Sequence, residues 1–213
     1  MEVKYPKFDI YEELYKRYFK KGVDYLVDRG NVENQDKVLD LCGGNGRLTR
    51  KLTTLTRDVT YVDQESDMIP DDLEKLGVNV INMSVSEFVD NNKDKFNKVF
   101  CEQAVNYWLL HIDMERFSKI FEKNGLFIFN TFSSEPSTKP MIKDYIIDGI
   151  NYLEISYLVS NQVQHVQIRE GVEPHFTVFD WISEEEYRKL LGDYFDLKVI
   201  DDGKSAIYIC RRK

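Results

Sequence analysis

Apolar residues along the chain change from a helical spacing to short strand-like runs and then to an alternating pattern. Between residues 36 and 132, short apolar runs are separated by amphipathic stretches. The apolar runs predict buried strands at 36–42, 59–63, 78–83, 98–104 and 126–132. Strands that alternate with helices predict a doubly wound α/β fold, a mostly parallel sheet with helices on both faces.

Helix signals separate these strands. We expect a helix over 47–56, a short helix broken near Pro70 and ended by Gly77, and a helix over 111–122 closed by Asn124-Gly125. Ser84 and Glu87 form a capping box, which predicts a further helix start.

The pattern differs after residue 132. A polar loop at 133–140 precedes alternating segments at 151–159, 163–170 and 175–181, which predict a small antiparallel sheet. Ser183 and Glu186 form a second capping box and open a helix that ends near Leu191. Segments 196–201 and 205–212 flank Asp202-Gly203, a strong hairpin signal. The prediction is a seven-stranded, mostly parallel sheet with an antiparallel edge hairpin and a small inserted antiparallel sheet.

This pattern divides the chain into three parts. Tyr11, Tyr18 and Leu26 are among the apolar residues that share one face at helical spacing, so residues 1–30 are predicted to form an N-terminal helical lid. The core comprises 31–132 and 182–213, and 133–181 form an inserted region that we expect to bind the acceptor. The exposed inserted sheet is also a candidate surface for a homodimer.

Charge and composition argue against several kinds of binding partner and against a metal site. The net charge of −8 argues against unaided binding to nucleic acid or to an anionic membrane, because both reward basic patches. The start of the chain lacks the apolar segment of a signal peptide, and no apolar run is long enough to span a bilayer, so we expect a cytoplasmic protein. The three cysteines lack metal-ligand spacing, and no HExxH pattern occurs, so we expect neither disulfides nor a metal.

The segment VLDLCGGNGRL, residues 38–48, joins a strand to a helix through glycines. Glycine permits a tight turn and a close backbone approach to a ligand, and ligands of doubly wound sheets bind at the carboxyl ends of the strands. The next strand ends in Asp63, whose carboxylate can accept hydrogen bonds from ribose hydroxyls. These features predict a nucleoside cofactor.

Two residues favour S-adenosylmethionine over a dinucleotide. Thr49 stands where a dinucleotide fingerprint has its third glycine, and Asp40 precedes the glycine loop. A carboxylate at that place would repel a pyrophosphate but would suit the ammonium group of a methionine moiety. A P-loop is excluded because its full motif also needs a glycine five residues before Gly-Lys-Ser, and the Gly-Lys-Ser at residues 203–205 has Lys198 there.

At these motifs the chain resembles the class I S-adenosylmethionine-dependent methyltransferases. VLDLCGGNGRLT is similar to their first motif, YVDQESDMI to the second, INMSVSEF to the third and NKVFCEQAVNYW to the fourth. The resemblance implies cofactor contacts from Asp40, Cys42, Gly44, Gly46, Asp63, Gln64, Met68, Ser84, Val85 and Glu102. It places Asp63 on the ribose and Met68 near the adenine, with Ser84 at a position where the family usually has Asp. The segment at residues 175–191, HFTVFDWISEEEYRKLL, looks similar to the corresponding part of sugar amine N-methyltransferases and glycine N-methyltransferase.

Catalytic residues are harder to assign, because methyl transfer needs alignment and one base rather than a nucleophilic side chain. We expect them among Tyr11 and Tyr18 of the N-terminal helix and His175 of the inserted sheet. His111 is predicted to cap a helix or to lie on the surface, and His165 to lie on a sheet face. The predicted function is methyl transfer to a nitrogen or oxygen of a small-molecule acceptor. The alternatives are a methyltransferase acting on nucleic acid or protein, a non-catalytic cofactor-fold binding module and an NAD oxidoreductase.

Overall fold

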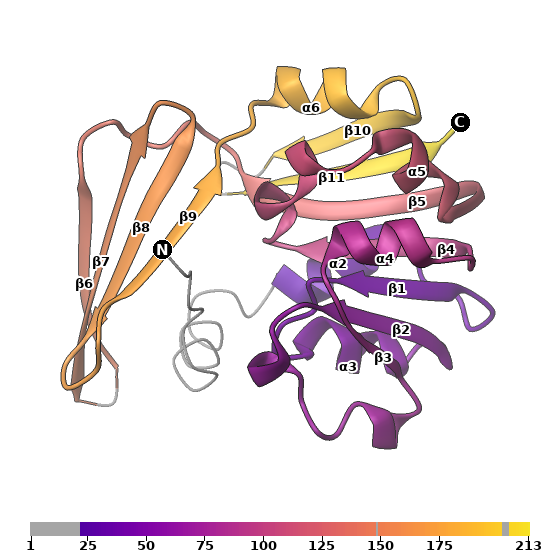
Figure 1. The fold of residues 1–213 in the computed structure, drawn as a ribbon, viewed down its shortest axis with the longest axis horizontal. Helices are drawn as coiled ribbons and strands as arrows, with labels where there is room; N and C mark the ends of the chain where they lie inside the picture. The colour runs from indigo at the N-terminus through magenta and orange to yellow at the C-terminus, as the bar shows by residue number, and fades with distance from the viewer. Residues whose placement is uncertain (1–21, 148, 202–204) are drawn as a thin grey trace.

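The structure is a computed structural model, and it describes residues 22–147, 149–201 and 205–213. These residues form a seven-stranded sheet and a separate four-stranded sheet, which lie side by side in Figure 1. The helices are α2 (Gly22–Gly30), α3 (Arg47–Thr53), α4 (Val85–Asn91), α5 (Met114–Lys119) and α6 (Glu184–Leu191), and short 3₁₀ helices lie at Ser66–Met68, Glu74–Leu76, Val105–Tyr107 and Leu109–His111.

The large sheet has the order β10-β11-β5-β4-β1-β2-β3. Its strands are β1 (Lys37–Leu41), β2 (Asp58–Asp63), β3 (Asn79–Asn82), β4 (Phe96–Glu102), β5 (Phe121–Phe132), β10 (Phe195–Asp201) and β11 (Ser205–Arg212). The pairs among β1 to β5 are parallel, whereas β11 runs antiparallel to both β5 and β10. The predicted fold class, with its antiparallel edge, is confirmed.

The small sheet is antiparallel and has the order β6-β7-β8-β9. Its strands are β6 (Met141–Ile147), β7 (Ile150–Val159), β8 (Gln162–Arg169) and β9 (His175–Asp180). It lies in the chain between β5 and α6, and β9 is the strand nearest to the large sheet in Figure 1. The sheet therefore occupies the predicted insertion.

Two apolar clusters cover the two faces of the large sheet. Val38 packs with α2 and α3, whereas its neighbour Leu39 packs with α4, α5 and α6. Successive strand residues point to opposite faces, so this split is what a sheet covered on both sides requires. Leu26 of α2 is fully buried in the first of these clusters. Helix α2 therefore belongs to the core layer, although the sequence placed residues 22–30 in the lid.

Local signals account for most of the boundaries. Both predicted capping boxes are present, with Ser84 accepting from the backbone N–H of Glu87 and Ser183 accepting from that of Glu186. Gly77 ends the 3₁₀ helix Glu74–Leu76 in the left-handed conformation, as predicted. The hairpin strands β10 and β11 pair as predicted, while the turn at 202–204 lies outside the described residues.

Two predictions were wrong. The helix expected at 111–122 spans only 114–119, because Asp113 caps its start and Phe121 already pairs with Phe96 in the sheet. Gly125 accordingly lies within β5 and not at a helix end. The sequence interpretation also left out β6, in which Ile142 and Ile146 are about two-thirds exposed. An outer strand with exposed apolar residues and no polar alternation gives little periodic signal.

Candidate functional site

A pocket of about 570 Å³ opens where β1, β2 and β4 end. Its walls include every predicted cofactor residue except Gly46, namely Asp40, Cys42, Gly44, Asp63, Gln64, Met68, Ser84, Val85 and Glu102. These residues come from consecutive strand ends, as expected for ligand sites in doubly wound sheets. Val178 of β9 also lines the pocket, so the inserted sheet contributes to its wall.

The glycine loop is held in shape by Tyr61 of β2. The Tyr61 hydroxyl donates a 2.6 Å hydrogen bond to the carbonyl of Gly44. A Cβ at Gly43 would lie 2.3 Å from the Tyr61 ring, so only glycine permits this approach. The loop can therefore present its backbone to a ligand while resting on a buried aromatic ring.

Gly46 has a structural role. It is the N-cap of α3 with a φ of 70°, and a Cβ there would lie 3.1 Å from Leu73 and Pro70. Gly46 is not among the described residues that line the pocket, and its predicted cofactor contact stays a prediction. Cys42 does line the pocket and has a φ of 56°, an uncommon conformation for a residue other than glycine.

Asp40 is buried at the bottom of the pocket with one oxygen satisfied. Its Oδ2 accepts a 2.6 Å hydrogen bond from the Thr49 hydroxyl. Its Oδ1 has no hydrogen-bond partner among the described residues. The pKa of Asp40 is raised to about 7, mainly by burial. The hydrogen bond from Thr49 acts in the opposite direction, and the nearby Glu102 and Asp63 add to the increase. This carboxylate lacks the counter-charge that a buried ionised acid requires.

Asp63 is buried at the end of β2 and is held by backbone groups. Its Oδ2 accepts from the Gly44 N–H at 2.8 Å, and its Oδ1 accepts from the Glu65 N–H at 2.9 Å. Burial raises its pKa, and these backbone hydrogen bonds act in the opposite direction. Each carboxylate oxygen can accept a second hydrogen bond, so the fixed carboxylate keeps capacity for a ligand.

Arg47 is a pocket residue that the sequence interpretation missed. Its Nη2 lies 2.5 Å from Oε1 of Glu102, and both side chains are largely buried. Burial raises the pKa of Glu102, and Arg47 lowers it. Arg47 is the first residue of α3, where a positive charge is unfavourable beside the positive end of the helix dipole. A cation at such a position could have indicated a carboxylate partner nearby.

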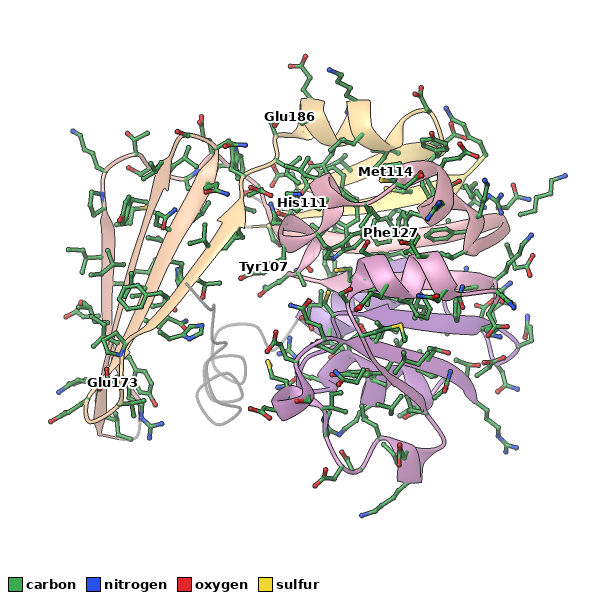
Figure 2. The ribbon with its side chains drawn as sticks, in the orientation of Figure 1. Tyr107, His111, Met114, Phe127, Glu173 and Glu186 are labelled. Atoms are coloured by element: carbon green, nitrogen blue, oxygen red, sulfur yellow. The ribbon has the colours of Figure 1, made fainter. Side chains whose placement is uncertain are left out.

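The loop after β4 joins the pocket to the inserted sheet. Asn106 is buried, its Nδ2 donates to the Asp180 carbonyl at 2.7 Å, and its Oδ1 accepts from the Thr131 hydroxyl at 2.6 Å. The Tyr107 ring lies 5.5 Å from that of Phe179. Figure 2 shows Tyr107 and His111 on the side of the core that faces the inserted sheet. Both residues line the pocket.

Of the three predicted catalytic residues, the structure describes His175 alone. His175 lies at the start of β9 and is not among the described residues that line it. Burial and the neighbouring His165 lower the pKa of His175 to about 4, which keeps it neutral at pH 7. Tyr11 and Tyr18 lie outside the described residues. His111, which the sequence assigned to a helix cap or the surface, does line the pocket.

Within residues 22–147, 149–201 and 205–213, His, Cys, Asp and Glu form no group of three or more that could hold a metal ion. The same residues contain no helix long and apolar enough to cross a membrane.

Comparison with known proteins gives a distant sequence relative and strong structural matches. No model of a known protein family matches the sequence. An uncharacterised methyltransferase of Schizosaccharomyces pombe is 30% identical over 112 residues, which cover 48% of this chain and 42% of that protein. The match thus spans less than half of the relative's length.

The solved structures match over nearly the whole chain. An S-adenosylmethionine-dependent methyltransferase from Clostridium acetobutylicum has a TM-score of 0.73 at 18% identity, covering 96% of this chain and 98% of that one. The chain has the class I methyltransferase fold. Another structure with this methyltransferase fold is that of CalS10, an amino pentose methyltransferase from Micromonospora echinaspora solved with S-adenosylmethionine bound. CalS10 has a TM-score of 0.67 at 12% identity, with all of both chains covered. The resemblance seen in the sequence motifs is confirmed at the level of the methyltransferase fold.

Proposed function

We propose that this chain binds S-adenosylmethionine and transfers its methyl group to a nitrogen or oxygen of a small-molecule acceptor. The observation that carries the proposal is Asp40, a buried carboxylate with one unpartnered oxygen at the end of β1. Such an atom needs a donor or a cation from a ligand. The ammonium group of the cofactor's methionine moiety supplies both.

The other predicted contacts fit the remaining parts of this ligand. Asp63 would accept hydrogen bonds from the ribose hydroxyls, since its carboxylate is fixed by Gly44 and Glu65. The Ser84 hydroxyl is engaged with Glu87 in the capping box. The adenine contact at this end would therefore come from the backbone N–H of Val85, because a first-turn N–H has no partner within its own helix. Met68 and Met83 supply apolar pocket wall for the adenine ring.

The charge of the pocket favours a cation over a dinucleotide. Four carboxylates line it, Asp40, Asp63, Glu65 and Glu102, and Arg47 is the only lysine or arginine among its described lining residues. A sulfonium is attracted by this excess of negative charge, whereas a pyrophosphate is repelled. An NAD oxidoreductase is accordingly the weaker alternative.

A small amine is the acceptor class that we favour. When bound, S-adenosylmethionine supplies an activated methyl group on a positively charged sulfur. The protein then has to align the acceptor with that methyl group and exclude water. Tyr107, His111 and Val178 line the pocket at the junction with the inserted sheet, where an acceptor could approach. CalS10 acts on an amino pentose, and the acidic pocket suits a similar cationic amine.

Two measurements test this proposal. Calorimetric titration with S-adenosylhomocysteine should show one site, and NADH should give no binding. Transfer of radiolabelled methyl groups from S-adenosylmethionine should then be assayed on amino sugars, amino acids and an RNA oligonucleotide. Labelling of an amine supports the proposal, and labelling of RNA alone would replace it with the nucleic-acid alternative. Binding with no transfer to any acceptor would favour the non-catalytic module.

A further inference from the structure

A histidine and an aspartate meet where the pocket borders the inserted sheet. His111 ends the 3₁₀ helix Leu109–His111 and Asp180 ends β9, so the pair links residues 69 positions apart in the sequence. The Nε2 of His111 lies 3.1 Å from Oδ2 of Asp180. The imidazole is 66% exposed and lines the pocket, whereas the Asp180 side chain is only 11% exposed.

Asp180 is fixed from several sides. The side-chain amide of Gln162 donates to its Oδ1 at 3.3 Å, and Asn106 donates to its backbone carbonyl at 2.7 Å. Asn106 is itself tied to Thr131 of β5. A carboxylate held in this way fixes the orientation and tautomer of the imidazole it contacts.

We propose that His111 is the general base for methyl transfer and that Asp180 is its positioning residue. The inference rests on the proposed function, and it names a residue that the sequence interpretation assigned to a helix cap or the surface. An ionised carboxylate only accepts hydrogen bonds, so the proton of the neutral imidazole lies on Nε2. Nδ1 is then the nitrogen that takes a proton from the acceptor.

The step balances without a further reactant. The acceptor's ammonium nitrogen gives a proton to Nδ1, and the resulting imidazolium is stabilised by the Asp180 carboxylate. The freed lone pair forms the new bond to the methyl carbon while the carbon–sulfur bond breaks and leaves its electron pair on sulfur. Because the imidazole is largely exposed, the proton can pass from it to solvent.

The charges around His111 are arranged for this role. Asp180 from β9 is the carboxylate in direct contact with the ring. Asp113 lies two residues farther along the chain, where it caps α5. The pocket shared with His111 also carries Glu102 from β4 and Arg47 from α3, which are paired with each other.

The test compares His111→Gln and Asp180→Asn with a matched control, His165→Gln. His165 is also a histidine near a carboxylate, 3.9 Å from Glu154, but it is not among the described residues that line the pocket. At pH 7, His111→Gln should lower kcat/KM for an amino-sugar acceptor about 100-fold, the low end for loss of a general base. The loss should shrink as the pH rises, because hydroxide and bulk water then deprotonate the amine. His165→Gln should match the wild type.

A second readout does not depend on turnover. The chain has three histidines, so nitrogen-15 chemical shifts of the imidazoles can be assigned by comparison with His111→Gln. In the S-adenosylhomocysteine complex, His111 should show the Nε2–H tautomer, and Asp180→Asn should shift the tautomer equilibrium. Asp180→Asn should also lower kcat more than it changes S-adenosylhomocysteine affinity.

The outcomes separate this inference from the proposed function. A wild type that neither binds the nucleoside nor methylates an amine overturns the proposed function. A wild type that methylates amines at a rate equal to His111→Gln at every pH overturns the assignment of the base alone. A Nδ1–H tautomer of His111 overturns it as well.

Discussion

The Thr49 hydroxyl lies 2.6 Å from Oδ2 of Asp40 and satisfies one side of a carboxylate that is buried in the pocket. In the sequence, Thr49 argues against a dinucleotide cofactor, because it replaces the third glycine of the dinucleotide-binding fingerprint. In the structure it has a positive role, since it holds Asp40 with the unpartnered Oδ1 left for a ligand. The residue that argues against a dinucleotide thus also fixes the carboxylate that we propose to bind the ligand's ammonium group.

Binding of S-adenosylhomocysteine should depend on pH through Asp40. Its pKa is raised to about 7 by burial, so much of it is protonated near neutral pH, and the ligand's ammonium group favours the ionised form. Affinity should fall below pH 7, approaching tenfold per pH unit, and binding should release a proton. Calorimetry in two buffers of different ionisation enthalpy measures that proton. Asp40→Asn should bind weakly and without this pH dependence.

The same carboxylate should affect the stability of the ligand-free protein. The pKa of Asp40 is higher in the folded state than its ordinary value of 3.8, so the folded state binds more protons between these values. The contribution of Asp40 to stability is therefore greatest below pH 3.8 and is lost as the pH rises through 7. The difference in unfolding free energy between wild type and Asp40→Asn, followed from pH 5 to 8, should show this loss. A constant difference would contradict the raised pKa.

Asp63→Ala should weaken S-adenosylhomocysteine binding by at least about tenfold, which corresponds to 1.4 kcal/mol. The variant would lose the proposed ribose contacts, and it loses the hydrogen bond that holds the Gly44 N–H. Asp58→Ala is the matched control, because Asp58 begins the same strand and is exposed. Equal dissociation constants for the two variants would count against the ribose assignment.

Arg47→Met should destabilise the protein because it leaves Glu102 buried without its partner. We expect a loss of about 1–3 kcal/mol in unfolding free energy, the usual cost of an unsatisfied buried group. Arg116→Met removes a similar 2.5 Å contact to Asp90, but both of those side chains are about half exposed. That control should change stability much less, because exposed ion pairs contribute little. Denaturant unfolding of both variants measures the difference, and equal effects would refute the structural role of the Arg47 pair.

Asn106→Ala should loosen the attachment of the inserted sheet. Asn106 is buried and hydrogen-bonded to Thr131 and to the Asp180 carbonyl, so its removal should cost about 1–3 kcal/mol. Compared with the wild type, amide hydrogen exchange should speed up more in β9 than in β1. Asn151→Ala is the control, since the exposed Asn151 side chain donates its hydrogen bond to the exposed Glu170. Unchanged exchange in β9 would show that other contacts hold the sheet.

The sequence predicts which strand-end residues line the pocket, because the signals for them are local. Asp40, Gly44 and Asp63 each stand at the end of an apolar run, and parallel pairing brings those ends together. The glycine loop, both capping boxes and the terminal hairpin strands likewise depend on neighbouring residues. The packing role of Gly46 was not predictable in this way, because Pro70 and Leu73, which leave no room for a Cβ there, come from another segment.

The junction with the inserted sheet was not predictable in the same way. His111 and Asp180 meet across 69 residues, and no spacing rule in the sequence joins them. His175 begins strand β9, but that strand brings Val178 to the pocket. Such contacts depend on how the small sheet docks, which is fixed by packing and hydrogen bonds between distant segments.

The most direct measurement of the central claim is a calorimetric titration of the purified chain with S-adenosylhomocysteine at pH 8, repeated with Asp40→Asn. We predict one site in the wild type and a large loss of affinity in the variant, because the buried Asp40 carboxylate would pair with the ligand's ammonium group. Absence of binding to the wild type at millimolar ligand, or equal affinity in the two proteins, would contradict the account.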